Sequence, residues 1–374
     1  MRARADVDTE AIRANVETLG RAAGAAGLLA VVKADGYGHG AVPSAHAVLA
    51  AGASWLGVAL IDEALQLRAA GITVPILVLL EPGPGAAAAA VEHDLDLGVG
   101  TTHALTEAAD FARLSGDAVR VHLKVDTGLA RGGATRDDWP DLVTTAAKLA
   151  GEGVVRVVGV WSHFVHSDDV RHPTTTRQLA AFRDALDIAD RSGLQPEVRH
   201  IASSGAALAL PEAHFDLVRP GLAVYGLSPM PATASPAQLG LRPAMTLRAQ
   251  VSLVKRVPRG TGVSYGHRYT TGSETSLALV PLGYADGVPR AATNTAELLI
   301  GGRRRRISGT VCMDQFVVDV GDDAVERGDD VILFGPGDAG EPTAQDWADR
   351  LDTITYEIVT RVGSRVPRTY PEAS

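Results

Sequence analysis

The sequence has little cysteine, few aromatic residues and no excess of positive charge. Cys312 is the single cysteine, so no internal disulfide can form, and a reducing compartment suits the protein. The formal net charge of -9 argues against nucleic acid or an acidic membrane as partner. The run from Arg303 to Arg306 is a local exception, which we expect to form a solvated strand or turn face.

Long hydrophobic runs are missing as well. No stretch approaches the roughly 20 apolar residues of a membrane-spanning helix, and Pro75 to Leu80 is typical of a buried strand. The N-terminal residues, Met1 to Asp6, lack the apolar core of a signal peptide. We therefore expect a cytoplasmic protein without a membrane partner.

The composition is that of a soluble globular protein, with 46% hydrophobic and 21% charged residues, and 374 residues favour two domains. Up to about residue 230, short apolar runs alternate with alanine-rich helical stretches. The first helix should begin near Asp8. The predicted strands are Leu28–Val32, Trp55–Leu60, Ile76–Leu80, Asp96–Val99, Val119–Val125, Val155–Ser162, Glu197–Ala202 and Phe215–Leu217. This alternation predicts an α/β fold, a (β/α)8 barrel of the TIM type.

A proline-rich connector, Ser228 to Pro236, ends the helical alternation, and we divide the chain into domains 1–230 and 231–374. The second domain should be mostly β, with one helix near Ala344–Leu351. Its predicted strands are Met245–Val257, Ser276–Pro281, Ala296–Ile300, Arg305–Ser308, Phe316–Val320 and Asp330–Phe334.

Lys33 follows the first predicted strand and is the centre of the candidate site. An apolar run from Gly27 to Val32 stops at this lysine, and glycines follow at positions 36, 38 and 40. Such a turn leaves backbone room for a ligand. A partly desolvated lysine at this place has a lowered pKa and can form a Schiff base. The alternative is a surface lysine that caps a loop between strand and helix.

Other predicted strand ends also carry polar groups. Lys124 and Arg131 are two cations at one strand end, where they repel unless an anion lies between them; a charged rim is the alternative. Ser204 opens an alanine-rich helix, where a hydroxyl can cradle a phosphate or simply cap the helix. His163, with His166 and His172 nearby, could suggest a metal site, but neither a cysteine partner nor an HExxH helix accompanies them.

The stretch from Val31 to Gly40 (Val-Val-Lys-Ala-Asp-Gly-Tyr-Gly-His-Gly) strongly resembles the pyridoxal-phosphate lysine motif of alanine racemases, and the similarity extends over nearly the whole chain. The resemblance implies a barrel that carries pyridoxal 5'-phosphate on Lys33 and a β domain that completes the site. The cofactor-binding residues it implies are Lys33, Tyr37, His163, Ser204, Arg219, Gly221, Leu222 and Tyr356.

The same resemblance assigns roles in substrate handling. Arg131 would hold the substrate carboxylate, Lys124 would carry a carbamate that orients Arg131, and Met313 would line the substrate pocket. Lys33 and Tyr265 would be the two bases, Lys33 for the D-antipode and Tyr265 for the L-antipode. A chain from Tyr265 through His163 to Arg219 would assist the tyrosine.

Two residues depart from the family pattern. Ser203 stands where asparagine is usual, next to the phosphate ligand, and Thr310 stands where an arginine is common, near the entrance.

The implied function is interconversion of L- and D-alanine, which supplies D-alanine for peptidoglycan, in a homodimer with composite sites. Arginine holds its proton at any relevant pH. Arg219 at the pyridine nitrogen therefore favours racemisation over the decarboxylation performed by related barrels. A racemase of broader amino-acid specificity and a non-catalytic pyridoxal-phosphate-binding protein are further alternatives, although such binding proteins lack the β domain.

Overall fold

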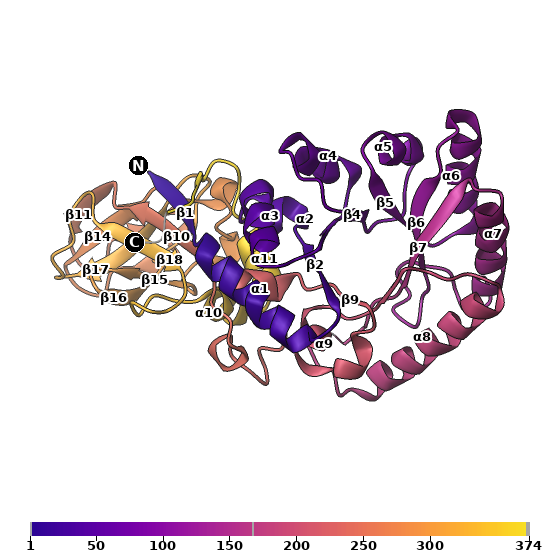
Figure 1. Ribbon diagram of the computed structural model, residues 1–374. Helices are drawn as coiled ribbons and strands as arrows, with labels where there is room; N and C mark the ends of the chain where they lie inside the picture. The colour runs from indigo at the N-terminus through magenta and orange to yellow at the C-terminus, as the bar shows by residue number, and fades with distance from the viewer. Residues whose placement is uncertain (1, 167, 372–374) are drawn as a thin grey trace. The chain divides into compact units, whose positions relative to one another are not determined.

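The computed structural model describes residues 2–166 and 168–371, which divide into two compact units (Figure 1). The barrel unit contains Ile12–Gly36 and Ala41–Leu241. The β unit is built from the described parts of Met1–Ala11, Tyr37–Gly40 and Arg242–Ser374. The chain thus contributes to the β unit from its N-terminus, from a short segment just after Lys33 and from its last third.

Parallel strands form the core of the barrel unit. Over the described residues, eight strands pair in the order β8-β7-β6-β5-β4-β3-β2-β9. They are β2 (Gly27–Val31), β3 (Trp55–Val58), β4 (Ile76–Val78), β5 (Leu95–Val99), β6 (Val119–Lys124), β7 (Val155–Trp161), β8 (Val198–His200) and β9 (Leu217–Val218). Each predicted strand is confirmed to within two residues at either end, and the barrel prediction is confirmed.

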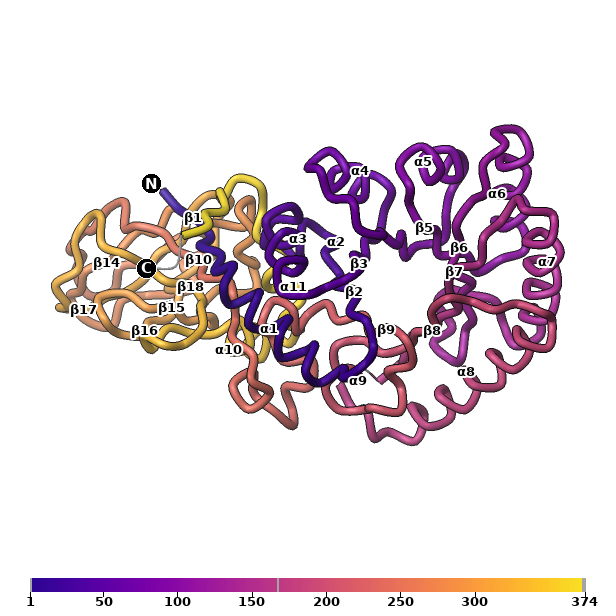
Figure 2. Tube along the Cα trace, viewed as in Figure 1, coloured from indigo at the N-terminus to yellow at the C-terminus, as the bar shows by residue number. Residues whose placement is uncertain are grey.

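The barrel closes by hydrogen bonds between segments that flank β8 and β9. Asp216 N donates to Arg199 O (3.1 Å), and Arg219 N donates to Ala202 O (2.8 Å). In Figure 2 the helices from α4 to α8 lie outside the strands. In chain order, the helical segments up to the end of the barrel are α1 (Thr9–Ala23), α2 (Lys33–Tyr37), α3 (Ala41–Ala50), α4 (Ile61–Ala69), α5 (Ala86–Glu92), α6 (Thr102–Ser115), α7 (Trp139–Gly151), α8 (Pro173–Arg191) and α9 (Ser204–Ala209).

Local capping explains where several helices begin. Asp8 Oδ1 accepts from Ala11 N (2.9 Å), so the cap predicted for the first helix is confirmed. Thr101 caps α6 in the same way, through Ala104 N (3.2 Å), and Gly116 ends that helix in the left-handed conformation. Among the described residues, no helix combines the length and the apolar character needed to cross a membrane.

The β unit consists mostly of sheets, as predicted, and most of their strands pair antiparallel. The largest has the order β16-β15-β18-β10-β1-β19, and smaller sheets are β11-β14-β17 and β12-β13. The strands are β1 (Ala3–Val7), β10 (Met245–Gln250), β11 (Leu253–Val257), β12 (Gly262–Val263), β13 (Tyr269–Thr270), β14 (Thr275–Val280), β15 (Glu297–Ile300), β16 (Arg303–Arg306), β17 (Phe316–Gly321), β18 (Asp330–Phe334) and β19 (Arg368–Thr369). The helices are α10 (Ala344–Leu351) and α11 (Thr355–Thr360).

The prediction of one strand over Met245–Val257 is wrong, because the chain changes sheets in its middle. Val251 N donates to Asp329 O, whereas Ser252 N donates to Leu279 O, both at 2.9 Å. The apolar pattern runs through this bend without a glycine or proline to mark it. The helix α10 is confirmed with the predicted bounds, and α11 was not predicted.

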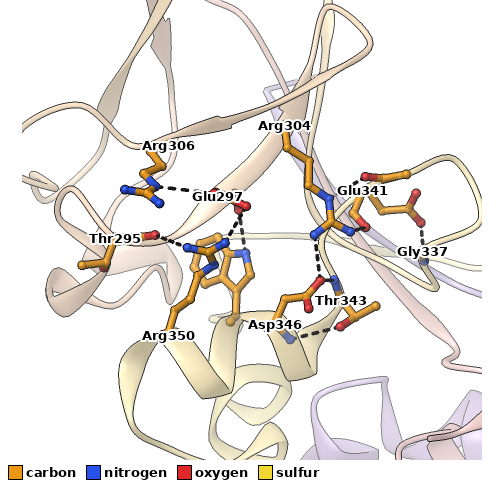
Figure 3. Close-up of polar contacts among 11 residues, drawn as sticks. Thr295, Glu297, Arg304, Arg306, Gly337, Glu341, Thr343, Asp346 and Arg350 are labelled. Carbon is orange, nitrogen blue, oxygen red and sulfur yellow. Dashed lines mark hydrogen bonds and ion pairs between the residues drawn. The ribbon is translucent and has the colours of Figure 1, made fainter.

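The four arginines of β16 form a largely exposed strand, as expected, and each pairs with an acidic side chain. Arg304 contacts Asp346 (3.1 Å) and Arg306 contacts Glu297 (3.5 Å), as Figure 3 shows. Arg303 and Arg305 both pair with Asp323. The run is therefore compensated within the fold, which removes the reason to expect a polyanion there.

Candidate active site

The candidate residues of the barrel unit lie at or just beyond the carboxyl ends of its strands. Lys33 follows β2, Lys124 ends β6, His163 follows β7 and Arg219 follows β9, while Ser204 opens α9 after β8. These ends share one face of a (β/α)8 barrel, where enzymes of this architecture place their active sites. The predicted strand-end positions are thus confirmed, although residue roles are a separate matter.

The segment α2 (Lys33–Tyr37) contains a left-handed turn that begins directly after Lys33. Ala34 (φ 52°, ψ 50°), Asp35 (φ 54°, ψ 48°) and Gly36 (φ 61°, ψ 45°) all lie in the left-handed region, and Gly36 N donates to Val32 O at 2.9 Å. A non-glycine residue costs about 1–2 kcal/mol in this conformation. Strain of this kind concentrates at functional sites, where the surrounding structure must hold it.

The environment of Lys33 lowers the pKa of its amine. Burial and the nearby Arg131 guanidinium lower its pKa, and the Glu63 carboxylate partly opposes them by raising it. A lysine with a lowered pKa is a better nucleophile and base near neutral pH.

Lys124 is also held among cations. Burial, Arg131 and Arg219 lower the pKa of Lys124 to about 8, against the opposing effects of Glu81 and Asp126. The Lys124 ammonium lies 4.5 Å from the centre of the Trp161 ring. The loop that leads to Arg131 is organised by Asp126, whose Oδ1 accepts from the backbone amides of residues 128 (2.8 Å), 129 (2.9 Å) and 130 (3.2 Å).

Arg219 is a buried cation with several acceptors. It is only 4% exposed, and burial lowers its pKa to about 9, so it stays protonated at neutral pH. Its Nη2 donates to Ser162 O (2.8 Å) and contacts His163 Nδ1 at 3.3 Å. Burial and the cations around it, Arg219 first, lower the pKa of His163 to about 3, so its imidazole is neutral. Because arginine can only donate, His163 Nδ1 accepts and the proton resides on Nε2.

A chain of buried polar groups leads away from Arg219 into the barrel, and sequence reasoning did not find it. Arg219 Nη1 contacts His200 Nδ1 (3.0 Å), and His200 Nε2 contacts His122 Nδ1 (2.9 Å). His122 Nε2 lies 3.4 Å from Asp96 Oδ2, and Arg120 donates to Asp96 Oδ1 (2.5 Å). A histidine at the end of β8 and an acid inside β5 were the available signals.

Ser204 is in contact with the segment that follows β9. Its Oγ is buried and accepts from Gly221 N (2.9 Å) and Ala223 N (3.3 Å), with Leu222 between them. A hydroxyl that accepts twice can still donate its own proton to an anion. Small side chains, a hydroxyl and clustered backbone amides are the usual components of a phosphate cradle.

The remaining predicted residues belong to the β unit. Tyr265 is 76% exposed and Met313 is 53% exposed. Thr310 Oγ1 donates to Tyr265 O (2.7 Å), so the unusual threonine supports the backbone of the predicted base. Tyr37 is buried, with its ring centre 5.9 Å from that of Tyr356 in α11. Burial first, and then the neighbouring Tyr356, raise the pKa of Tyr37 well above its usual range.

Close backbone packing explains one glycine of the Lys33 turn. Gly38 has φ 81°, and an added Cβ would lie 2.4 Å from Val359 O in α11. Only glycine accommodates both the conformation and the contact.

The histidines after β7 have structural contacts. The rings of His166 and His172 stack at 3.7 Å, and His172 Nδ1 accepts from Thr174 N (3.1 Å) at the start of α8. Across residues 2–166 and 168–371, no group of three or more histidine, cysteine or acidic side chains is arranged to hold a metal.

These donors fit pyridoxal phosphate. An aldehyde cofactor needs a nucleophilic amine, and the lowered pKa of Lys33 makes its amine more nucleophilic; the cofactor's phosphate needs donors such as those around Ser204. The protonated Arg219 could donate a hydrogen bond to a ring nitrogen, and the neutral His163 imidazole suits an aromatic neighbour.

Comparison with known proteins gives a consistent result over the full chain. The family model "Alanine racemase, N-terminal domain" matches residues 7–229, and "Alanine racemase, C-terminal domain" matches residues 244–370. An alanine racemase of Frankia casuarinae is 62% identical over 370 residues, 99% of this chain and 96% of the relative. One of Thermobifida fusca is 57% identical over 371 residues, 99% of this chain and 98% of the relative.

Solved structures agree. The alanine racemase from D-cycloserine-producing Streptomyces lavendulae superposes with a TM-score of 0.98 at 54% identity, covering 100% of this chain and 98% of that one. The Bacillus anthracis alanine racemase with bound L-Ala-P gives a TM-score of 0.92 at 35% identity, covering 100% of this chain and 95% of the other.

Proposed function

The chain belongs to the alanine racemase family, and we propose that it moves the Cα proton of alanine between two bases, Lys33 and Tyr265. It is a pyridoxal-phosphate-dependent isomerase, EC 5.1.1.1, that interconverts L- and D-alanine. The D-alanine that this family makes serves peptidoglycan synthesis. A lone cysteine suits the reducing cytoplasm, where we place the reaction.

The observation that best supports the assignment is that Arg219 is buried and remains protonated at neutral pH. Bound pyridoxal phosphate supplies an electron sink that makes the Cα proton removable. With its pKa at about 9, Arg219 donates a hydrogen bond to the ring nitrogen but keeps its own proton. By not giving up this proton, Arg219 would limit the electron demand of the ring and favour return of the proton to Cα, which is what racemisation requires.

The other residues divide the work of binding and proton transfer. Lys33 exchanges the proton with one antipode, which the lowered pKa of its amine supports. Tyr265 exchanges it with the other antipode from the opposite face. Arg131 binds the substrate carboxylate, and a carbamate on Lys124 would turn a repelling cation into an orienting anion. Met313 lines the substrate pocket.

Ser204, with the Gly221 and Leu222 amides, and Tyr356 would hold the phosphate. The contacts of Ser204 support this assignment, because its Oγ accepts from the amides of Gly221 and Ala223, which bring the backbone on both sides of Leu222 to the hydroxyl. Tyr37 supports Tyr356 through the contact between their rings. His163, whose Nδ1 accepts from Arg219, would pack against the cofactor ring.

We propose further that two copies of the chain share each site. Tyr265, Met313 and Tyr284 are 76%, 53% and 45% exposed, although large apolar and aromatic groups are costly to leave in water. A symmetric dimer in which the β unit of one copy completes the barrel mouth of the other contains two composite sites.

The test is turnover in both directions. The purified chain should racemise L- and D-alanine, with serine as a comparison substrate. Lys33→Ala should abolish turnover and also the cofactor adduct that borohydride reduction leaves on the wild-type chain, detected by mass. A reduced adduct of full yield in Lys33→Ala would refute the assignment of Lys33.

A further inference from the structure

The carboxylate of Glu63, in the first turn of α4, connects two loops at the barrel mouth. Its Oε1 accepts from Ala34 N at 2.6 Å. Its Oε2 accepts from Ala59 N (2.7 Å) and Leu60 N (3.1 Å), in the loop between β3 and α4. Hydrogen bonds to a carboxylate are about twice as strong as those between neutral groups.

The contact with Ala34 lies at a strained point. Ala34 is the first residue of the left-handed turn and immediately follows Lys33. Its φ of 52° is disfavoured for alanine, which relaxes to negative φ unless something holds it. Such a relaxation would redirect the backbone at Lys33 and move the amine.

We propose that Glu63 is a positioning residue for Lys33, whose carboxylate holds the left-handed turn and so fixes the direction of the lysine side chain. The inference rests on the proposed function, in which the Lys33 amine carries the cofactor and transfers the proton. Glu63 itself need touch neither substrate nor cofactor.

The geometry makes glutamine a sharp test. Both oxygens of Glu63 face backbone N–H donors, Ala34 on one side and Ala59 with Leu60 on the other. Whichever way a glutamine amide turns, its NH2 group meets another donor, so one loop loses its partner. Glu63→Asp keeps the charge but shortens the reach by one methylene.

The reactivity of Lys33 distinguishes the effect of the negative charge of Glu63 from the effect of its side-chain length. The charged group that opposes Glu63 at Lys33 is Arg131, from the loop after β6, while His163 after β7 is neutral. Because the Glu63 anion raises the pKa of Lys33, its removal lowers that pKa further. The readout is acylation of Lys33 in the cofactor-free full-length chain, followed against pH by peptide mass spectrometry.

We expect Glu63→Gln to reduce turnover of both antipodes by about 10- to 100-fold, because a small displacement of the reacting group is enough for such a loss. Its Lys33 acylation profile should shift to lower pH. Glu63→Asp should lose turnover while its acylation profile stays near that of the wild type. Far-UV circular dichroism and thermal unfolding establish that each variant is folded.

Relieving the backbone strain at Ala34 should restore the turnover of Glu63→Gln. Glycine adopts positive φ without penalty, so adding Ala34→Gly to Glu63→Gln should recover most of the lost turnover. Thr343→Ala is the matched control, because it removes a side-chain cap from helix α10 and should change neither readout. Turnover within about two-fold of wild type in both Glu63 variants would overturn the proposal. Failure of Ala34→Gly to rescue would overturn it as well.

The outcome also separates this inference from the function it rests on. A wild-type chain that does not racemise alanine refutes the proposed function. If the wild-type chain racemises alanine but the Lys33 acylation profile of Glu63→Gln is not shifted, the role of Glu63 is refuted and the proposed function stands.

Discussion

Arg219 and Asp96 are buried groups of opposite charge that are connected through the imidazoles of His200 and His122. Arg219 at one end and Asp96 at the other determine which ring nitrogen of each histidine carries the proton. Arg219 can only donate, so His200 Nδ1 accepts, and His200 Nε2–H donates to His122 Nδ1. His122 Nε2–H then points to Asp96, the acceptor. Burial and then Arg219 lower the pKa of His200, which keeps its ring neutral.

Asp96→Asn should destabilise the barrel by about 1.5–3 kcal/mol, since it removes a charged acceptor from His122 and Arg120. Burial alone would raise the pKa of Asp96, but its hydrogen bonds from His122 and Arg120 outweigh burial and lower it. Its stabilising effect is therefore present above the unfolded-state pKa and is lost as pH falls through the folded-state value.

Urea unfolding at a series of pH values measures this effect. The difference between wild type and Asp96→Asn should be largest near neutral pH and shrink in acid. Asp110→Asn, at an exposed surface pair, is the control. A difference that is independent of pH would show that the Asp96 charge does not drive it.

Lys124 should carry a carbamate. The neutral amine attacks CO2 and loses one proton, and a pKa of about 8 leaves a useful neutral fraction near neutral pH. Carbon-13 NMR with labelled bicarbonate should show one resonance, which weakens as the pH falls and the amine becomes protonated. Lys124→Ala should lack it, whereas the exposed Lys148→Ala should retain it. A wild type without the resonance and fully active without bicarbonate contradicts this prediction.

Tyr265→Phe should affect the two antipodes unequally. If Tyr265 is the base for L-alanine, removal of its hydroxyl should slow α-deuterium exchange from L-alanine by about 100-fold or more. Exchange from D-alanine, which uses Lys33, should be far less affected. Equal losses for both antipodes would mean that Tyr265 has only a structural role.

Mixed dimers test whether sites are shared. Lys33→Ala and Tyr265→Ala, each inactive alone, are mixed under conditions that exchange subunits. In a mixed dimer with shared sites, one site collects both lesions and the other has none, so roughly a quarter of all sites should recover activity. If mixed dimers form and activity stays at zero, each site is built within one chain.

The sequence predicts well those features that depend on local pattern. Buried parallel strands appear as apolar runs between helices, and Lys33, Lys124 and Arg219 stand out because a polar group follows each run. The contacts between residues far apart in the chain are harder to foresee. His122 and His200 lie on different strands, and their pairing depends on β7 between them. The left-handed turn was foreseen only as a glycine-rich loop, because Ala34 and Asp35 do not by themselves favour positive φ.

β1 was missed although its sequence, Ala-Arg-Ala-Asp-Val, alternates in the manner of a strand. Its neighbours in the sheet come from far along the sequence, since Ala3 pairs with Ala249 and Asp6 pairs with Thr369. On the ribosome it is made more than 230 residues before β10, so it must wait roughly ten seconds or more for that partner. During that time it is an unpaired edge, open to wrong association. The charges of Arg4 and Asp6, on the face opposite Ala3, Ala5 and Val7, give the nascent strand a built-in protection against aggregation until its partners arrive.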